Sequence, residues 1–140
     1  MKPEELLKAA QQARTKSYAP YSNFRVGAAL LTCDGRIFLG GNIESASYGA
    51  TICAERSAVA SAVSSGARSF CAIAIVGGPA EKELSAPCPP CGICLQVLSE
   101  FCGPDFPIYL QDEKGEVKTY LLKELLPVAF RESSLGGKKE

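Results

Sequence analysis

The first residues of the chain show the apolar spacing of an amphipathic helix that runs from Pro3 to about Ser17. Proline suits the first turn of a helix, and the two glutamates that follow it suit the positive end of the helix dipole. The helix cannot continue through Pro20, so a loop is expected there. The predicted apolar face consists of Leu6, Leu7, Ala10 and Ala13.

Short apolar runs bounded by turn residues predict five strands, at 26–32, 36–39, 71–76, 107–111 and 116–120. The first two flank Asp34-Gly35, which is a strong hairpin signal, and Gly40-Gly41 is expected to end the second. The third is continuously apolar, as is typical of a strand covered on both faces.

Helices are predicted at about 53–65, which is rich in Ala and Ser, and at about 91–102, with an apolar inner side. The intervening stretches 42–52 and 77–90 are expected to be irregular. Residues 133–140 are expected to form a flexible tail. The chain has no repeats and no obvious linker, so residues 1–140 are predicted to be one α/β domain, with helices on both faces of one mixed sheet.

Charge excludes one class of partner. The 140 residues carry 15 basic and 15 acidic side chains, with no basic stripe of the kind that binds phosphates, so a nucleic acid polymer is not expected as a partner. No segment resembles a signal peptide or a membrane-spanning helix, so no membrane association is expected and the predicted location is the cytoplasm.

The chain has seven cysteines and no histidine. In a reducing compartment, cysteines are read first as metal ligands or catalytic thiols rather than as disulfides. Without histidine, Ser-His and Cys-His machinery is excluded, and a zinc site must use thiolates and carboxylates. Cys33, Cys71 and Cys102 are expected to be small buried apolar residues.

Two fragments carry candidate chemistry, Cys53-Ala54-Glu55 and Pro90-Cys91-Gly92-Ile93-Cys94. The last two thiols lie three residues apart, so they share one side of a first helical turn, where free N–H groups favour the thiolate. Three thiolates would leave the fourth zinc position to water. Glu55 is placed to act on that water, and the combined pattern is a known signature of zinc deaminases, with the glutamate as general acid and base.

The charge of such a site also matters. Zinc with three thiolates carries one net negative charge, which opposes the ionisation of water. Arg56, next to Glu55, is a candidate to offset it through hydrogen bonds to the sulfurs. From charge alone, an ordinary surface arginine on a helix is an equally good interpretation.

Together these motifs resemble the cytidine deaminase family in its small homotetrameric, zinc-dependent form. The resemblance spans about residues 3–130. It rests on Tyr18–Leu30, Gly41–Glu44, Cys53–Arg56, Pro90–Cys94 with Gln96, Glu124–Pro127 and Phe130.

The resemblance implies a five-stranded sheet with flanking helices and one Zn²⁺ per subunit. It implies hydrolysis of cytidine and deoxycytidine to uridine and deoxyuridine with release of ammonia, as in pyrimidine salvage. A zinc-activated water would attack C4 of the base while Glu55 carries the protons.

The resemblance also assigns the substrate contacts. Phe24 would stack on the pyrimidine, although without the resemblance it would be interpreted as an aromatic residue of the core. Asn42 and Glu44 would bind the ribose hydroxyls, and Ala54 would offer backbone groups to the base. Three residues would complete the pocket of a neighbouring subunit, so the site would form only in the oligomer: Ala46, Tyr48 and Phe130.

Two positions depart from the family pattern. Leu95 stands where the family usually has arginine, so compensation of the negative charge of the zinc site depends more on Arg56. Cys88 is an additional thiol and creates a competing Cys88-Pro-Pro-Cys91 spacing. The prolines favour an extended backbone at Cys88, away from the turn that carries Cys91, so Cys91 and Cys94 are predicted to be the ligands and Cys88 is not.

Three other functions compete with this interpretation. One is a deaminase of a blasticidin-type nucleoside antibiotic, against which Phe24 and the Asn42-Ile43-Glu44 segment argue. Another is a structural zinc module, which requires a closed four-ligand site. A polynucleotide editor is the third, and the chain lacks the charge for it.

Overall fold

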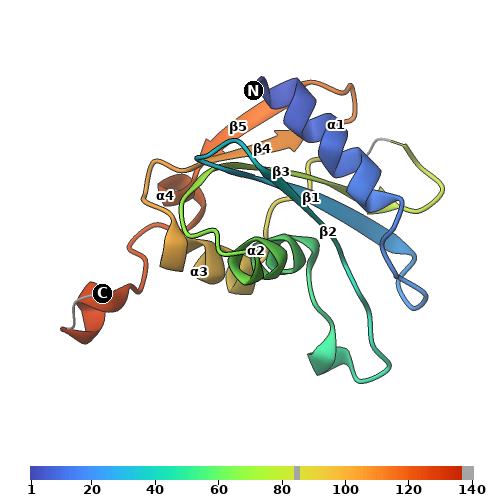
Figure 1. The fold of residues 1–140 in the computed structure, drawn as a ribbon. Coiled ribbons are helices and arrows are strands. Elements are labelled where there is room, and N and C mark those ends of the chain that lie inside the picture. Colours follow the sequence, from blue (N-terminus) through green and yellow to red (C-terminus); the bar gives the residue numbers. More distant parts are fainter. Residues whose placement is uncertain (84–85, 137–140) are drawn as a thin grey trace.

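The computed structural model describes residues 1–83 and 86–136 and contains one mixed sheet (Figure 1). Its strand order is β2-β1-β3-β4-β5. β3 and β4 are parallel, and all other neighbours are antiparallel, which confirms the predicted hairpin between β1 and β2. The strands are β1 (Phe24–Thr32), β2 (Ile37–Gly41), β3 (Phe70–Pro79), β4 (Pro107–Gln111) and β5 (Val117–Leu121).

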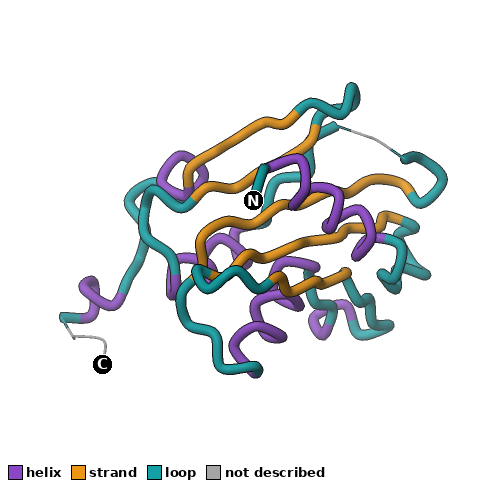
Figure 2. Tube along the Cα trace, turned by 45° about the horizontal axis from the view of Figure 1, so that its top comes forward, coloured by secondary structure: helices purple, strands orange, loops and turns teal. Residues whose placement is uncertain are grey.

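Helices cover both faces of the sheet, as predicted. Figure 2 shows α1 lying across one face, and α2, α3 and α4 lie on the other. The predicted apolar face of α1 is buried in full. The helices are α1 (Pro3–Arg14), α2 (Ala54–Ser64), α3 (Gly92–Phe101) and α4 (Leu122–Leu125), with 3-10 turns η1 (Tyr48–Ala50) and η2 (Glu132–Leu135).

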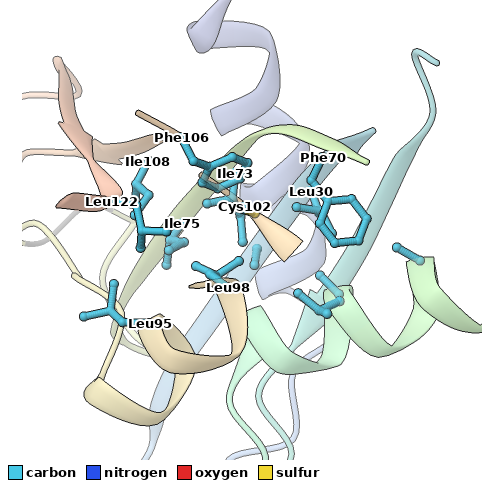
Figure 3. Packing of buried hydrophobic residues seen from close by; sticks show 14 of the residues in the cluster. Leu30, Phe70, Ile73, Ile75, Leu95, Leu98, Cys102, Phe106, Ile108 and Leu122 are labelled. Atoms are coloured by element: carbon cyan, nitrogen blue, oxygen red, sulfur yellow. The ribbon is translucent and has the colours of Figure 1, made fainter. Parts of the chain in front are cut away.

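The larger core lies between the sheet and α2, α3 and α4. Leu98 of α3 points toward Ile73 and Ile75 of β3, and Leu122 of α4 closes the same cluster (Figure 3). Each of these side chains is less than 2 % exposed. This packing fixes the positions of α2 and α3 relative to the strand ends, where the candidate chemistry lies.

Several predicted boundaries are wrong, including the start of β1, which lies at Phe24. β3 runs to Pro79 because Phe24 pairs with Pro79 across the antiparallel ladder, so the irregular stretch expected from residue 77 begins as strand. β2 ends at the glycine pair, as expected, but Gly40 and Gly41 are its last two residues, so it runs beyond the predicted 36–39. A Cβ on Gly40 would approach the backbone nitrogen of Ala58 to 2.4 Å, so glycine lets α2 pack directly against β2. α1 ends at Arg14, earlier than expected.

The interpretation of Cys33 and Cys71 as buried apolar residues is also wrong. Both are exposed, and they form a disulfide with their Cα atoms 5.1 Å apart. Cys33 follows β1 and Cys71 lies at the start of β3, and the pairing of these strands brings them together. Cys102 is buried, as predicted.

The C-terminal part of the described chain leaves α4 and extends away from the sheet (Figure 1). Residues 132–135 form η2, whereas residues 137–140 of the expected tail lie outside the described residues. Among the residues that the structure describes, none of the helices is long and apolar enough to cross a membrane.

Candidate active site

Two helix starts meet beside the sheet, and each begins with a cysteine. Cys53 is the N-cap of α2, and Cys91 is the N-cap of α3, with Cys94 in the first turn of that helix. The Cys53 side chain makes no capping hydrogen bond to the backbone of α2, whereas the Cys91 thiol accepts from backbone N–H groups of the first turn of α3. The backbone N–H groups and the positive helix ends favour negative charge here.

The three sulfur atoms form a compact cluster. The Sγ atoms of Cys53 and Cys91 are 3.8 Å apart, those of Cys91 and Cys94 are 3.5 Å apart, and all three lie within 4.8 Å of one another. Sulfurs about 2.3 Å from a tetrahedral zinc are about 3.8 Å from each other, so this spacing fits a zinc ion. Within residues 1–83 and 86–136, Cys88 does not belong to the cluster.

The pKa values of the two α3 thiols move in opposite directions. Burial raises the pKa of Cys94, and the negative charges of Glu55 and Cys53 add to this. Burial also acts on Cys91, but hydrogen bonds from the backbone N–H groups of Cys94 and Ile93 and from the neighbouring thiols outweigh it and lower its pKa. A metal that binds this cluster must therefore displace a proton from Cys94.

Arg56 lies against the cluster. Its Nη2 donates to Cys53 Sγ at 3.7 Å and to the carbonyl of Thr51 at 3.4 Å. The Cys53 side chain is the largest cause of the raised pKa of Arg56. Within the described part of the chain, its buried Nε has no hydrogen-bond partner, which suits a cation beside a group of anionic sulfurs. Leu95 stands where the family usually has arginine. It packs into the core and therefore adds no positive charge beside the cluster.

Glu55 is a buried carboxyl group, 4 % exposed, in the first turn of α2. Burial raises its pKa, although its own backbone N–H, the Cys94 thiol and Arg56 partly oppose this. A raised carboxyl pKa brings proton exchange closer to neutral pH. Glu55 lines a cavity of about 170 Å³ together with Val26, Asn42, Thr51, Ile52, Cys53, Ala54, Cys88, Pro89 and Cys91.

A second cavity of about 390 Å³ adjoins the first, because Thr51 lines both. Its other lining residues are Tyr21, Ser22, Glu44, Ser45 and Tyr48. Cys53, Cys91 and Glu55 therefore line the first cavity and Glu44 lines the second, and these two neighbouring cavities are together called the hollow.

The two residues assigned to the ribose are already held by the backbone. Asn42 accepts a hydrogen bond from the N–H of Val26 and donates one to the carbonyl of Phe24, both at 2.9 Å. Its amide keeps one N–H and one lone pair free for a ligand. Glu44 accepts from the N–H groups of Tyr21 and Ser22, and the Ser22 hydroxyl is the main cause of its lowered pKa. Glu44 is therefore an ionised acceptor at neutral pH.

The remaining predicted contacts are dispersed in the single chain. Phe24, Ala46 and Phe130 are exposed and line neither of these cavities, whereas Tyr48 lines the second one although it is 77 % exposed.

The sequence reasoning missed Thr51 and Val26, which line the cavities. Val26 could have been found, because it lies two residues after Phe24 and so on the same face of its strand.

Comparison with known proteins adds the decisive observation. The family described as "Cytidine and deoxycytidylate deaminase zinc-binding region" matches residues 1–110. The chain belongs to the cytidine deaminase family. The family description names zinc, and the three-thiol cluster is consistent with one zinc ion per subunit.

Individual members of the cytidine deaminase family resemble the whole chain. A cytidine deaminase of Halalkalibacterium halodurans is 48 % identical, with 93 % of this chain and 95 % of the relative covered. The crystal structure of a cytidine deaminase from Burkholderia pseudomallei superposes with a TM-score of 0.84 at 48 % identity, covering 93 % and 100 % of the two chains. A more distant relative is a blasticidin-S deaminase of Bacillus cereus, 33 % identical with 90 % of each chain covered.

Proposed function

We propose that this chain catalyses the hydrolytic deamination of cytidine and deoxycytidine to uridine and deoxyuridine. The observation that carries the proposal is the buried carboxyl group of Glu55 beside the three-thiol cluster, in a cavity that shares Thr51 with the cavity lined by the ionised Glu44. A site that binds a nucleoside requires two regions, one for the reacting base and one for the sugar hydroxyls. The neutral net charge agrees with a free nucleoside rather than a polymer.

Cys53, Cys91 and Cys94 are the residues that would hold the zinc, and Arg56 offsets part of their negative charge. Zinc in such a site supplies an acidified water for attack on carbon. Glu55 accepts the proton of the attacking water and passes it to N3 of the base. A C4–O bond forms, Glu55 then takes the proton of the new C4 hydroxyl group and gives it to the N4 amino group, and the C4–N4 bond breaks to release ammonia.

The remaining contacts orient the nucleoside. Glu44 and Asn42 accept and donate hydrogen bonds to the ribose hydroxyls, and the backbone of Ala54 faces the base from the start of α2. Phe24 stacks on the pyrimidine ring. The roles of Glu44, Asn42 and Ala54 are supported by their place in the lining of the two cavities, whereas the role of Phe24 rests on the resemblance to the family.

We also propose that the active form is a homo-oligomer, a tetramer by resemblance to the small family members. The support is the exposure of Tyr48 and Phe130, which are large aromatic side chains on segments that project from the domain. A second copy would cover them and complete the hollow. We also propose a cytoplasmic location, because a reducing compartment protects thiolate ligands from oxidation; the Cys33–Cys71 disulfide is the feature that argues against it.

A blasticidin-type nucleoside antibiotic is the second candidate substrate, because a blasticidin-S deaminase is among the relatives. The ionised Glu44 at the sugar end favours a ribonucleoside. The test is ammonia release by the purified zinc-loaded protein from cytidine, deoxycytidine, free cytosine, adenosine and blasticidin S. We expect activity on the first two. Activity on blasticidin S alone, or on none of the five, would refute the proposal.

A further inference from the structure

Cys88 has no role in the proposed chemistry, yet it lines the same cavity as Glu55. It lies in the proline-rich segment that leads to Cys91, and the thiol cluster excludes it. Its side chain is partly buried rather than open to solvent. A side chain in this place faces whatever occupies the cavity.

The Cys88 thiol is held in a fixed position. A Cβ on Gly77 would lie 2.7 Å from Cys88 Sγ and 3.1 Å from its Cβ, so the thiol rests directly on the backbone of β3. Gly77 pairs with Val26 across the sheet, and a Val26 methyl group borders the same point. Because Pro89 and Pro90 also restrict the backbone, this wall cannot retreat from a ligand.

The Cys88 thiol is uncharged at neutral pH. Burial, followed by the negative charges of Glu55 and Cys53, raises the pKa of Cys88 to about 11. A protonated thiol behaves as a small apolar group.

We propose that Cys88 is a specificity-determining residue that limits the size of the substituent at C5 of the cytosine ring. This inference rests on the proposed function. C4 must lie beside Glu55, and the atoms next to C4 are N3, N4 and C5. N3 and N4 exchange protons with Glu55, whereas C5–H makes no hydrogen bond, so C5 is the position that suits a fixed apolar wall.

The test compares cytidine with 5-methylcytidine in wild-type protein and in Cys88→Ala. One methyl group in an apolar pocket changes kcat/KM by about tenfold or more. We expect Cys88→Ala to raise the ratio of kcat/KM for 5-methylcytidine to that for cytidine by about tenfold. Cys88→Val fills the space further and should lower the ratio. Cys102→Ala, which changes a buried cysteine that lines neither cavity, is the matched control and should leave the ratio unchanged.

Binding of the products gives a readout that needs no turnover. Calorimetric affinities of uridine and 5-methyluridine should shift in the same direction as the kinetic ratio, with zinc content equal in all variants. An unchanged ratio in both Cys88 variants, with cytidine still deaminated, would overturn the inference and leave the proposed function intact. Failure of the wild-type protein to deaminate cytidine would overturn the proposed function itself.

Discussion

The two ends of the hollow are built differently. The zinc end consists of two helix starts, with Glu55 buried and Cys94 fully covered. The sugar end lies on the irregular segment 42–52, where Tyr48 is largely exposed although Glu44 is tied to the backbone. The thiol cluster and Glu55 are thus assembled within one chain on helix starts. The cavity lined by Glu44 and Tyr48, in contrast, is open to solvent in the single chain. Substitutions at the two ends should therefore have different consequences.

The largest effect is expected for the ligands at the zinc end. Cys94→Ser should lose both zinc and deamination, because the cluster retains two thiols and serine is a poor zinc ligand. Zinc is measured by metal analysis of the purified protein, and deamination by ammonia release. Circular dichroism establishes that the variant is folded.

Cys88→Ser is the matched control for metal binding, because Cys88 lies outside the cluster. It should retain one zinc ion per subunit. Loss of zinc from this variant would mean that Cys88 occupies the fourth position and that the site is a closed structural one.

The next largest effect is expected at Glu55. Glu55→Gln keeps the size of the side chain and removes the proton carrier, so turnover of cytidine should fall at least about a hundredfold, the usual scale of general acid–base catalysis. Zinc content should stay at the wild-type level. Glu5→Gln, also in the first turn of a helix but exposed on α1, should behave as wild type. Near-normal turnover in zinc-loaded Glu55→Gln would exclude the proposed role.

The positions at the zinc end could be predicted from sequence because they depend on local structure. The helix starts at Cys53 and Cys91 follow from apolar periodicity and from the break at Pro90, and the shared face of Cys91 and Cys94 follows from helical spacing. The layered sheet followed from the same patterns. Element boundaries shifted: Phe24 and Pro79 extended each other's strand through pairing, and α1 ended at Arg14.

Features that depend on long-range contacts could not be predicted. The Cys33–Cys71 disulfide requires the pairing of β1 with β3, which no local pattern reveals. The backbone bonds of the Asn42 amide depend on β1 lying beside the segment after β2. Whether Phe130 reaches a neighbouring pocket depends on another chain. The resemblance to the family supplied that expectation, and it stays a prediction.

A subunit-mixing experiment tests whether the open end is completed by a second copy. Phe130→Ala and Glu55→Gln should each be poorly active, the first because a neighbouring pocket loses its aromatic side chain. In a randomly mixed oligomer about a quarter of the sites combine an intact Glu55 with an intact Phe130 from the neighbour. Mixing after dissociation and reassociation should therefore restore part of the activity. Full activity of a monomer in sedimentation experiments would contradict the oligomeric site.

The smallest effect on catalysis is expected at the Cys33–Cys71 disulfide. It lies at the ends of β1 and β3 remote from Val26 and Gly77, so it does not touch the hollow. Cross-linking residues separated by 38 positions stabilises a fold by up to about 4 kcal/mol in the chain-entropy description. Cys33→Ser should lower the free energy of unfolding by up to that amount while zinc content and turnover at 25 °C stay at the wild-type level.

Denaturant unfolding with and without a reducing agent measures the stability contribution of this disulfide. Reduction should destabilise the wild-type protein as much as Cys33→Ser does, and it should leave Cys33→Ser itself unchanged. If reduction alters neither protein, the two thiols are not bonded in solution. If Cys33→Ser instead loses zinc, the disulfide and the zinc end influence each other across the sheet. The difference between the two ends of the hollow would then not follow from local structure alone.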